Sequence, residues 1–399
     1  MTASRRTFLG SVAAAPAAAA GRTRSPNDRI GIGLIGNGSR GRFHLGDLLK
    51  ARAENIAITG VCDVHRPARE AMAERAAAAF NTAVRKTADY RELLSWKEVD
   101  AVIIASPDFT HSQILADAVR AGRDVYCEKP MATLFADAKL AYHAVRASQQ
   151  VVQIGTQRRS EPGLLGAARL MQQGVLGQVT RVDMEVNFQE PRWRHATPEF
   201  REEDVDWAQF LFGRSERPFD ARRIREWQLF RDYTNGLPGL WMSHFIDLVP
   251  WFTGRPYPLS AVASGGVYLW KDGRETEDTF QALLEYPGGL LVRWAMSLTN
   301  ASPANRNLWY GTRGVLDCDA LRITGEGSKD PRRVTADIAV ERVQAESHME
   351  NFLRCVRSRK TPRADIQAGF SHAVAGIMSA EALRTGRRVT FDATRLELV

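Results

Sequence analysis

The chain has 399 residues, of which 44% are hydrophobic and 25% charged, and its formal net charge is +8. This composition is typical of a globular protein of two or three domains and excludes a fibrous or intrinsically disordered chain. No stretch approaches the ~20 apolar residues that a membrane-spanning helix needs, and basic residues are interspersed with acidic ones, so we expect no membrane anchor and no nucleic-acid partner.

Residues 1–20 are predicted to be a signal peptide for export, and residues 21–28 a polar linker. The segment Ser4-Arg5-Arg6-Thr7-Phe8-Leu9 places paired arginines before a short, alanine-rich run, which resembles a twin-arginine signal. This signal class implies export of folded proteins, often with a cofactor inside. We therefore expect a periplasmic or otherwise exported protein that the twin-arginine machinery recognises; a disordered basic tail is the alternative.

The first folded segment carries a dinucleotide-binding pattern. Residues 29–35 predict a strand that leads directly into a G-x-G-x-x-G loop, which consists of Gly36, Asn37, Gly38, Ser39, Arg40 and Gly41. A helix and a second strand at 56–61 follow, and Asp63 stands 22 residues after Gly41, near the ~20 expected of an acid that binds a ribose hydroxyl. The three glycines of such a loop permit the tight turn, the approach of a pyrophosphate, and close packing of the helix.

The predicted cofactor is NAD. Asp63 would repel a 2′-phosphate, although Arg40 and Arg66 keep NADP possible. An exported enzyme would meet little free nicotinamide cofactor, so we expect the cofactor to be tightly bound. A glycine-rich turn in another α/β fold is the alternative explanation of the loop.

Alternating strands and helices predict an α/β domain over residues 29–150, built on a doubly wound parallel sheet. Further strands are expected at 100–105 and 124–127, and helices at 66–80, 89–96 and 110–121. Ligands bind beyond the carboxyl ends of such strands. The candidate cofactor contacts that follow these strands are Ser106, Pro107, Asp108, His111, Glu128 and Lys129.

Lys129 is the candidate catalytic residue of this domain. It follows a strand at the ligand edge, and Pro130 restricts the backbone beside it. The positive charge of an oxidised nicotinamide would lower the pKa of a neighbouring ammonium group, which could then bind a substrate oxygen and shuttle its proton. A surface lysine after a strand is the alternative.

Three motifs together resemble the Gfo/Idh/MocA family, which includes glucose–fructose oxidoreductase and inositol dehydrogenase. They are Gly36–Gly41, Ala105–Asp108 with His111, and Glu128–Pro130. The resemblance implies an N-terminal Rossmann domain and a C-terminal α/β domain with a large, open, mainly antiparallel sheet. It also implies that Lys129 lies beside the nicotinamide and that a histidine of the second domain completes the site.

Residues 151–399 are predicted to form the second domain, for substrate binding and oligomerisation. Period-two alternation without long helices between the runs favours an antiparallel sheet. The expected strands span 179–186, 261–268, 279–286, 290–294 and 315–319, and the expected late helices span 347–357 and 370–385. As in the family, an exposed sheet face favours a homo-oligomer, either a dimer or a tetramer.

A histidine for the site stands in the segment 239–248, which resembles the family signature D-x-G-x-H-x-x-D. His244 matches the histidine and Asp247 the last acid, but Leu240 replaces the first acid and Met242 the glycine. If the segment is helical, Leu240, His244, Asp247 and Trp251 share one stripe. His244 is the candidate general base, because imidazole titrates near pH ~6.5; a satisfied core histidine is the alternative.

Aromatic and polar residues of the second half are candidates for substrate contacts. Sugars present apolar faces and a fringe of hydroxyl groups, which suits an aromatic wall with a few polar groups. Core packing is the alternative role for the tryptophans. The candidates are Gln157, Arg158, Asn187, Trp193, Trp227, Arg231, Tyr233, Trp241 and Asp247.

Three functions fit the sequence. The leading hypothesis is an NAD(P)-dependent oxidoreductase that transfers a hydride between the cofactor and a secondary hydroxyl of a sugar or polyol, with His244 as base and Lys129 stabilising the alkoxide. The first alternative is a redox-cycling glycosidase, which oxidises C3, eliminates the aglycone, adds water and reduces again with bound NAD. The second is a non-catalytic carbohydrate-binding scaffold. The four cysteines form no Cys/His cluster, so no metal is expected.

Overall fold

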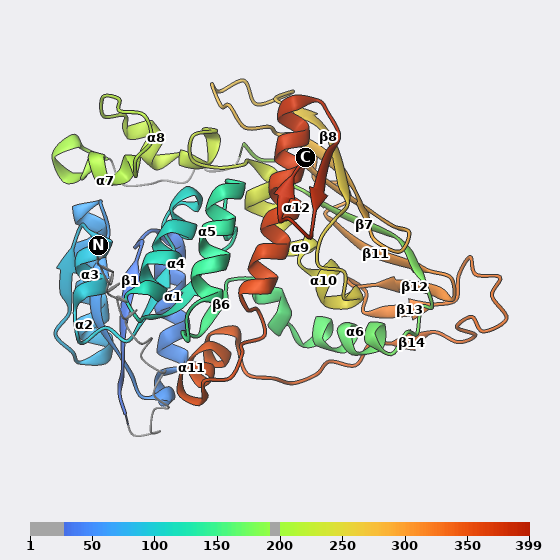
Figure 1. Cartoon of the computed structure of the whole chain (residues 1–399), viewed down its shortest axis with the longest axis horizontal. Helices are drawn as coiled ribbons and strands as arrows, with labels where there is room; N and C mark the ends of the chain where they lie inside the picture. The colour runs from blue at the N-terminus through green and yellow to red at the C-terminus, as the bar shows by residue number, and fades with distance from the viewer. Residues whose placement is uncertain (1–27, 192–199) are drawn as a thin grey trace, which may run out of the picture.

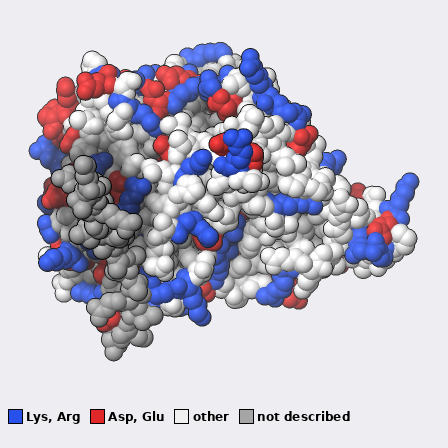
Figure 2. Space-filling model, viewed as in Figure 1, with Lys and Arg blue, Asp and Glu red and all other residues white. Residues whose placement is uncertain are grey.

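The computed structural model describes residues 28–191 and 200–399, and Figure 1 shows them as two α/β halves that lie side by side. The predicted signal peptide and Trp193 lie outside the described residues. Within the described part, no helix is long and apolar enough to cross a membrane. Lys and Arg side chains are mixed with Asp and Glu over the face shown in Figure 2.

The first half is built on a parallel sheet of six strands in the order β3-β2-β1-β4-β5-β6. The strands are β1 (Ile30–Ile35), β2 (Ile56–Cys62), β3 (Arg85–Thr87), β4 (Ala101–Ile104), β5 (Asp124–Cys127) and β6 (Val152–Ile154). The helices are α1 (Ser39–Lys50), α2 (Arg66–Phe80), α3 (Tyr90–Ser95), α4 (His111–Arg120) and α5 (Phe135–Arg146). Every residue of β1 is buried, as expected of a strand covered on both faces. The doubly wound parallel fold is confirmed, and β6 carries this sheet slightly beyond residue 150.

The second half is built on a ten-stranded sheet in the order β14-β13-β12-β11-β7-β10-β9-β8-β15-β16. The strands are β7 (Val179–Asn187), β8 (Ser260–Gly266), β9 (Thr279–Tyr286), β10 (Leu290–Ser297), β11 (Asn305–Gly311), β12 (Gly314–Asp317), β13 (Arg322–Thr324), β14 (Ile338–Ala339), β15 (Val389–Asp392) and β16 (Glu397–Leu398). Only β7 and β10 pair in parallel among these described strands, so the prediction of a mainly antiparallel sheet is confirmed.

One face of this sheet is covered by helices and the other is partly open. The helices of this half include α6 (Pro162–Gln172), α9 (Ser243–Ile246), α10 (Leu248–Thr253), α11 (His348–Ser358) and α12 (Ile366–Thr385). Burial alternates residue by residue along β9, and Leu283 and Leu291 remain 42% and 39% exposed on the uncovered face. Alternation of buried and exposed residues along a strand is expected of a sheet that is covered on one face only.

The C-terminal helices connect the two halves. Helix α12 contacts both β8 of the second sheet and α5 of the first half, and Figure 1 shows it between them. It begins at Ile366, four residues before the predicted start, because the Asp365 side chain accepts a 3.1 Å bond from the backbone N–H of Ala368 and caps it. Helix α11 packs Met349 and Phe352 into the same apolar core as β1 and α1.

Residues 200–233, which we call the cap segment, extend from the second half over the carboxyl ends of the first sheet. Helices α7 (Trp207–Leu211) and α8 (Ala221–Arg225) lie there in Figure 1. Phe210 and Tyr233 pack against Phe109, which precedes α4. The backbone N–H of Asp206 donates a 2.9 Å bond to the Val64 carbonyl after β2. The cap segment therefore closes one side of the edge at which ligands of parallel sheets bind.

Candidate functional site

A cleft of about 550 Å³ lies between the carboxyl ends of the first sheet and the second half. Its volume lies in the range of ~300–1,000 Å³ that is usual for ligand sites. The predicted residues that line it from the first half are Gly36, Gly38, Ser39, Arg40, Asp63, Ser106, Pro107, Asp108, His111, Glu128 and Lys129. The second half supplies Phe200, Phe210, Ile224, Trp227, Gln228, Leu240 and His244.

The glycines of the loop before α1 serve two different purposes. Gly36 has φ +88°, and a Cβ there would lie 2.4 Å from the Ser106 nitrogen, while a Cβ on Gly41 would lie 2.1 Å from the Gly36 oxygen. These two positions need glycine so that the loop can pack. A Cβ on Gly38 would meet no protein atom within 4 Å, although Gly38 lines the cleft.

The loop can hold a pyrophosphate in this open space. Helix α1 begins at Ser39 with no side chain capping it and no acidic residue in its first turn. The N–H groups of a first helical turn have no intrahelical partner and attract anions. The residues present therefore fit the phosphates of a dinucleotide. The Asn37 side chain is buried and donates to the Cys62 carbonyl at 3.2 Å, so it fixes the loop to β2, and the role of Asn37 in cofactor binding stays a prediction.

Asp63 lies at the far end of the cleft, where an adenosine ribose is expected. Its carboxylate accepts bonds from the backbone N–H groups of Asn37 at 2.6 Å and His65 at 2.8 Å. Arg66, which could have received a 2′-phosphate, forms an ion pair with Asp204 near the cap segment's start. The charges at this end therefore favour NAD over NADP.

Glu128 anchors the segment that carries the candidate lysine. The buried Oε1 atom accepts bonds from Arg40 Nε, His44 Nε2 and Gln157 Nε2, each at 2.8 Å. Burial raises the pKa of this carboxyl, but the His44 bond and the Arg40 charge outweigh it and hold the pKa well below its usual range. Gln157, predicted to contact substrate, instead fixes Glu128 and also donates to the Tyr126 hydroxyl at 2.7 Å.

Lys129 and His244 come from the two halves and line the same cleft. Lys129 Nζ donates a 2.6 Å bond to the backbone carbonyl of Leu240, so position 240 contacts the lysine through its backbone. Burial, followed by the charge of Lys129, holds the pKa of His244 well below its usual value. His244 is therefore a neutral imidazole at pH 7, as a proton acceptor must be.

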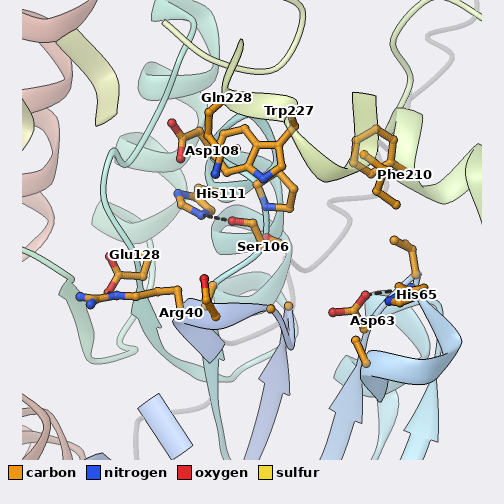
Figure 3. Close-up of a pocket in the computed structure, with 18 of the residues that line it drawn as sticks. Arg40, Asp63, His65, Ser106, Asp108, His111, Glu128, Phe210, Trp227 and Gln228 are labelled. Carbon is orange, nitrogen blue, oxygen red and sulfur yellow. Dashed lines mark hydrogen bonds and ion pairs between the residues drawn. The ribbon is translucent and has the colours of Figure 1, made fainter. Parts of the chain in front are cut away.

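Asp108 and His111 lie together on the wall between these residues and the cap segment. The His111 ring nitrogens lie 2.8 Å from the carbonyl oxygens of Ser106 and Pro130, so this buried ring ties two strand ends together. Asp108 is 5% exposed, and Figure 3 shows it next to Gln228 of the cap segment. Burial raises the pKa of Asp108 to about 6, against the lowering effect of the nearby charges of His111 and Lys129.

Asp247 does not contact the cleft, which corrects the prediction. Residues 238–242 form a π-helical turn and α9 ends at Ile246, so the predicted single stripe is interrupted on both sides of His244. The Asp247 carboxylate is fully buried and accepts bonds from Arg159 Nε at 2.7 Å and Nη2 at 2.9 Å. It joins the second half to the segment after β6.

Three other candidates for substrate contact also have structural partners. Asn187 donates to the Pro303 carbonyl at 2.8 Å and accepts from the Ser297 N–H at 2.9 Å. Tyr233 is fully buried in the apolar core of the cap segment. Arg231 Nε donates to the Glu275 carbonyl at 3.0 Å. None of the three lines the described cleft, so the structure gives no support to their predicted contacts with substrate.

Two candidates remain near His244. The Trp241 ring lies 6.0 Å from the His244 ring and 5.0 Å from the Phe188 ring. The Arg158 guanidinium lies 4.3 Å above the Phe245 ring. Trp227, from the aromatic-rich stretch noted in the sequence, lines the cleft with Gln228, which sequence reasoning missed (Figure 3). No group of three or more His, Cys, Asp or Glu side chains that could hold a metal occurs among the described residues.

Comparisons with known sequences match both halves of the chain to one family of oxidoreductases. Residues 30–156 match a family described as "Oxidoreductase family, NAD-binding Rossmann fold", and residues 205–317 match the "GFO/IDH/MocA C-terminal domain". Inositol 2-dehydrogenase of Gluconacetobacter diazotrophicus is 34% identical over 155 residues, which are 38% of this chain and only 44% of that protein. An uncharacterized oxidoreductase of Synechocystis sp. is 28% identical over 314 residues, covering 75% of this chain and 74% of that protein.

Solved structures share the whole architecture. Levoglucosan dehydrogenase in complex with NADH superposes with a TM-score of 0.68 at 17% identity, covering 91% of this chain and 99% of that one. A dehydrogenase from Bordetella pertussis in complex with NADH and UDP-GlcNAcA gives a TM-score of 0.68 at 19% identity, covering 92% and 99%. At these identities the likeness shows a common fold.

Proposed function

Because the chain belongs to the Gfo/Idh/MocA oxidoreductase family and carries its NAD-binding Rossmann domain, we propose that it oxidises or reduces a secondary hydroxyl carbon of a sugar or polyol. The observation that carries this proposal is the meeting of Lys129 and a neutral His244 in one cleft that also contains the phosphate-binding loop. The names of the relatives support the substrate class, since they include an inositol dehydrogenase and a levoglucosan dehydrogenase.

The residues of the cleft divide the work between binding and proton transfer. The loop Gly36–Gly41 and the start of α1 would hold the pyrophosphate, and Asp63 a ribose hydroxyl. NAD, when bound, supplies the ring that accepts or returns a hydride. His244 takes the proton of the substrate hydroxyl, and the Lys129 ammonium, whose position Leu240 fixes, stabilises the negative charge that develops on that oxygen.

We also propose that the cofactor is retained between turnovers. The cap segment contributes Phe200, Phe210 and Trp227 to the wall of the cleft, so a dinucleotide would contact both halves of the chain. A retained cofactor must be reoxidised in place, either by a second substrate or in a closed cycle. This feature favours the redox-cycling glycosidase as the second candidate function.

One experiment separates these functions. The purified mature protein is denatured, and the released nucleotide and its redox state are identified. The folded protein is then incubated with sugars and polyols plus NAD while absorbance at ~340 nm is followed, and separately with aryl glycosides without added cofactor. Steady NADH formation supports the dehydrogenase, and aryl release without added NAD supports the glycosidase. A protein that neither contains nor binds NAD contradicts both and supports the carbohydrate-binding scaffold.

Export and assembly are part of the proposal. The pair Arg5-Arg6 supports export by the twin-arginine route, so an Arg5→Lys, Arg6→Lys variant should accumulate unprocessed in the cytoplasm. The partly open face of the second sheet, with exposed Leu283 and Leu291, supports a dimer or tetramer. Light scattering of the purified protein measures the latter, and a monomer at working concentrations would contradict it.

A further inference from the structure

Position 240 lacks a group that can accept a proton. The family signature has an acid where this chain has Leu240, and the Leu240 carbonyl accepts the bond from Lys129 Nζ at 2.6 Å. A backbone carbonyl can hold an ammonium group but cannot take its proton. A carboxylate elsewhere at this end of the cleft could take the proton in its place.

Three carboxylates among the described residues line the cleft, and two of them have other roles. Asp63 lies beside the backbone of Asn37 and His65, at the end opposite Lys129. Glu128 is fixed by its three side-chain donors and stays ionised, because those donors hold its pKa well below the usual range despite burial. Asp108 is the remaining carboxylate.

Asp108 reaches the backbone of the segment that carries position 240. Its Oδ2 atom accepts a 3.2 Å bond from the Thr234 hydroxyl, and a Cβ placed on Gly239 would lie 3.8 Å from the same oxygen. Gly239 directly precedes Leu240. A Cβ there would lie at ordinary contact distance from this oxygen, so the Asp108 carboxylate packs against Gly239 from the opposite half of the molecule.

The groups that face Asp108 leave it able to exchange a proton near neutral pH. The charged neighbours on its own half are His111 and Lys129, with Glu128 acting against them, and the second half contributes the Thr234 hydroxyl and the neutral His244 of the same cleft. Burial outweighs these charges and raises the pKa of Asp108 to about 6.

We propose that Asp108 replaces the acid missing at position 240 and holds the proton that the site gains when substrate is oxidised; this rests on the proposed function. The C–H hydrogen leaves the substrate with its electron pair for the oxidised nucleotide, the C=O bond forms, and the hydroxyl proton, taken first by His244, ends on the Asp108 carboxylate of the same cleft. The reverse reaction returns it. Asp108 acts through His244 and Lys129, so it is a positioning residue.

The proposal predicts that the titration of Asp108 depends on the redox state of the nucleotide. Reduction removes one positive charge from the cleft, so the carboxylate loses a stabilising neighbour and its titration midpoint should rise by roughly one pH unit. Protein labelled with ¹³C at the aspartate carboxyl carbons is titrated by NMR, once with oxidised and once with dithionite-reduced nucleotide bound. The resonance of interest is the one absent from Asp108→Asn.

Two variants provide matched controls. Thr234→Val keeps the carboxylate but removes its hydrogen bond, so the midpoint should rise in both redox states. In Asp108→Asn/Leu240→Asp, a redox-sensitive carboxyl should reappear at the family position. A wild-type midpoint that does not change on reduction overturns the proposal, as does a Thr234→Val midpoint equal to that of the wild type. Failure of the double variant to fold leaves these two comparisons decisive. Wild-type protein that binds no nucleotide contradicts the proposed function itself, whereas nucleotide binding with an insensitive carboxyl contradicts only the role of Asp108.

Discussion

Gly38 allows nucleotide binding to be removed without disturbing the fold. Its φ of −67° suits alanine, and an added Cβ would meet no protein atom within 4 Å. We therefore expect Gly38→Ala to change the free energy of unfolding by less than about 1 kcal/mol, since a small cost at the helix cap opposes the reduced entropy of the unfolded chain.

The same methyl group would occupy the space assigned to the pyrophosphate. A phosphate displaced from the loop loses at least one hydrogen bond from a backbone N–H, and bonds to charged groups contribute about 1.5–3 kcal/mol each. Because about 1.4 kcal/mol corresponds to a tenfold change, the Kd for NADH should rise by roughly 10- to 100-fold. Fluorescence titration with NADH measures this change, and the nucleotide content of the purified variant gives an independent measure.

Gly41→Ala is the matched control one turn further along the chain. There the Cβ would lie 2.1 Å from the Gly36 oxygen, so the loop and helix must move apart. We expect a loss of about 1–3 kcal/mol in unfolding free energy, measured by urea denaturation of nucleotide-free protein. Wild-type affinity for NADH in Gly38→Ala would refute the assignment of the loop to the phosphates. Equal destabilisation by the two variants would refute the claim that Gly41 is needed for packing and Gly38 is not.

Four further predictions follow from the site and its supports. Lys129→Ala should lower the turnover of the sugar or polyol that the wild-type protein oxidises by about 10²- to 10⁴-fold, while the nucleotide content of the purified variant stays unchanged. Near-normal turnover would exclude a catalytic role for Lys129. Asp247→Asn leaves the buried Arg159 unpaired and should lower the unfolding free energy by about 3–5 kcal/mol in urea denaturation; a loss under about 1 kcal/mol would contradict this. Burial lowers the pKa of His348 and of His372 to about 4, so the unfolded chain binds more protons than the folded one below pH ~6.5, and stability is lost as the pH falls. Each histidine should lower the free energy of unfolding by about 2 kcal/mol between pH 7 and pH 5. A stability that does not change with pH over this range would contradict the prediction. Asp204→Ala frees Arg66 from its ion pair and should shift the ratio of Kd values toward NADP, whereas an unchanged ratio would place the 2′-hydroxyl elsewhere.

The sequence predicted those parts of the site that depend on local spacing. The loop Gly36–Gly41, Asp63 and the Glu128–Pro130 segment follow predicted strands, and parallel strands bring their carboxyl ends to one edge. That Lys129 and His244 line the same cleft could be expected only from the family resemblance, because no local sequence pattern relates residues so far apart in the chain.

Contacts made over long distances in the chain were not predictable in this way. The pairing of Asp247 with Arg159 joins residues 88 positions apart, and the π-helical turn before His244 breaks a periodicity that reads as one regular helix. The cap segment has short helices and scattered aromatic residues without a period that marks its target. Strand β11 begins with Asn305, Arg306 and Asn307, whose polarity hid it, although Asn307 is fully buried.

The cap segment makes the nucleotide cleft a product of both halves of the polypeptide. Residues 200–233 are synthesised well after the glycine loop, so the walls of the cleft are complete only once the second half has folded. A dinucleotide bound in the finished cleft would lie between residues of both halves. Entry or exchange of the dinucleotide would therefore require the contact between the cap segment and the first half to open.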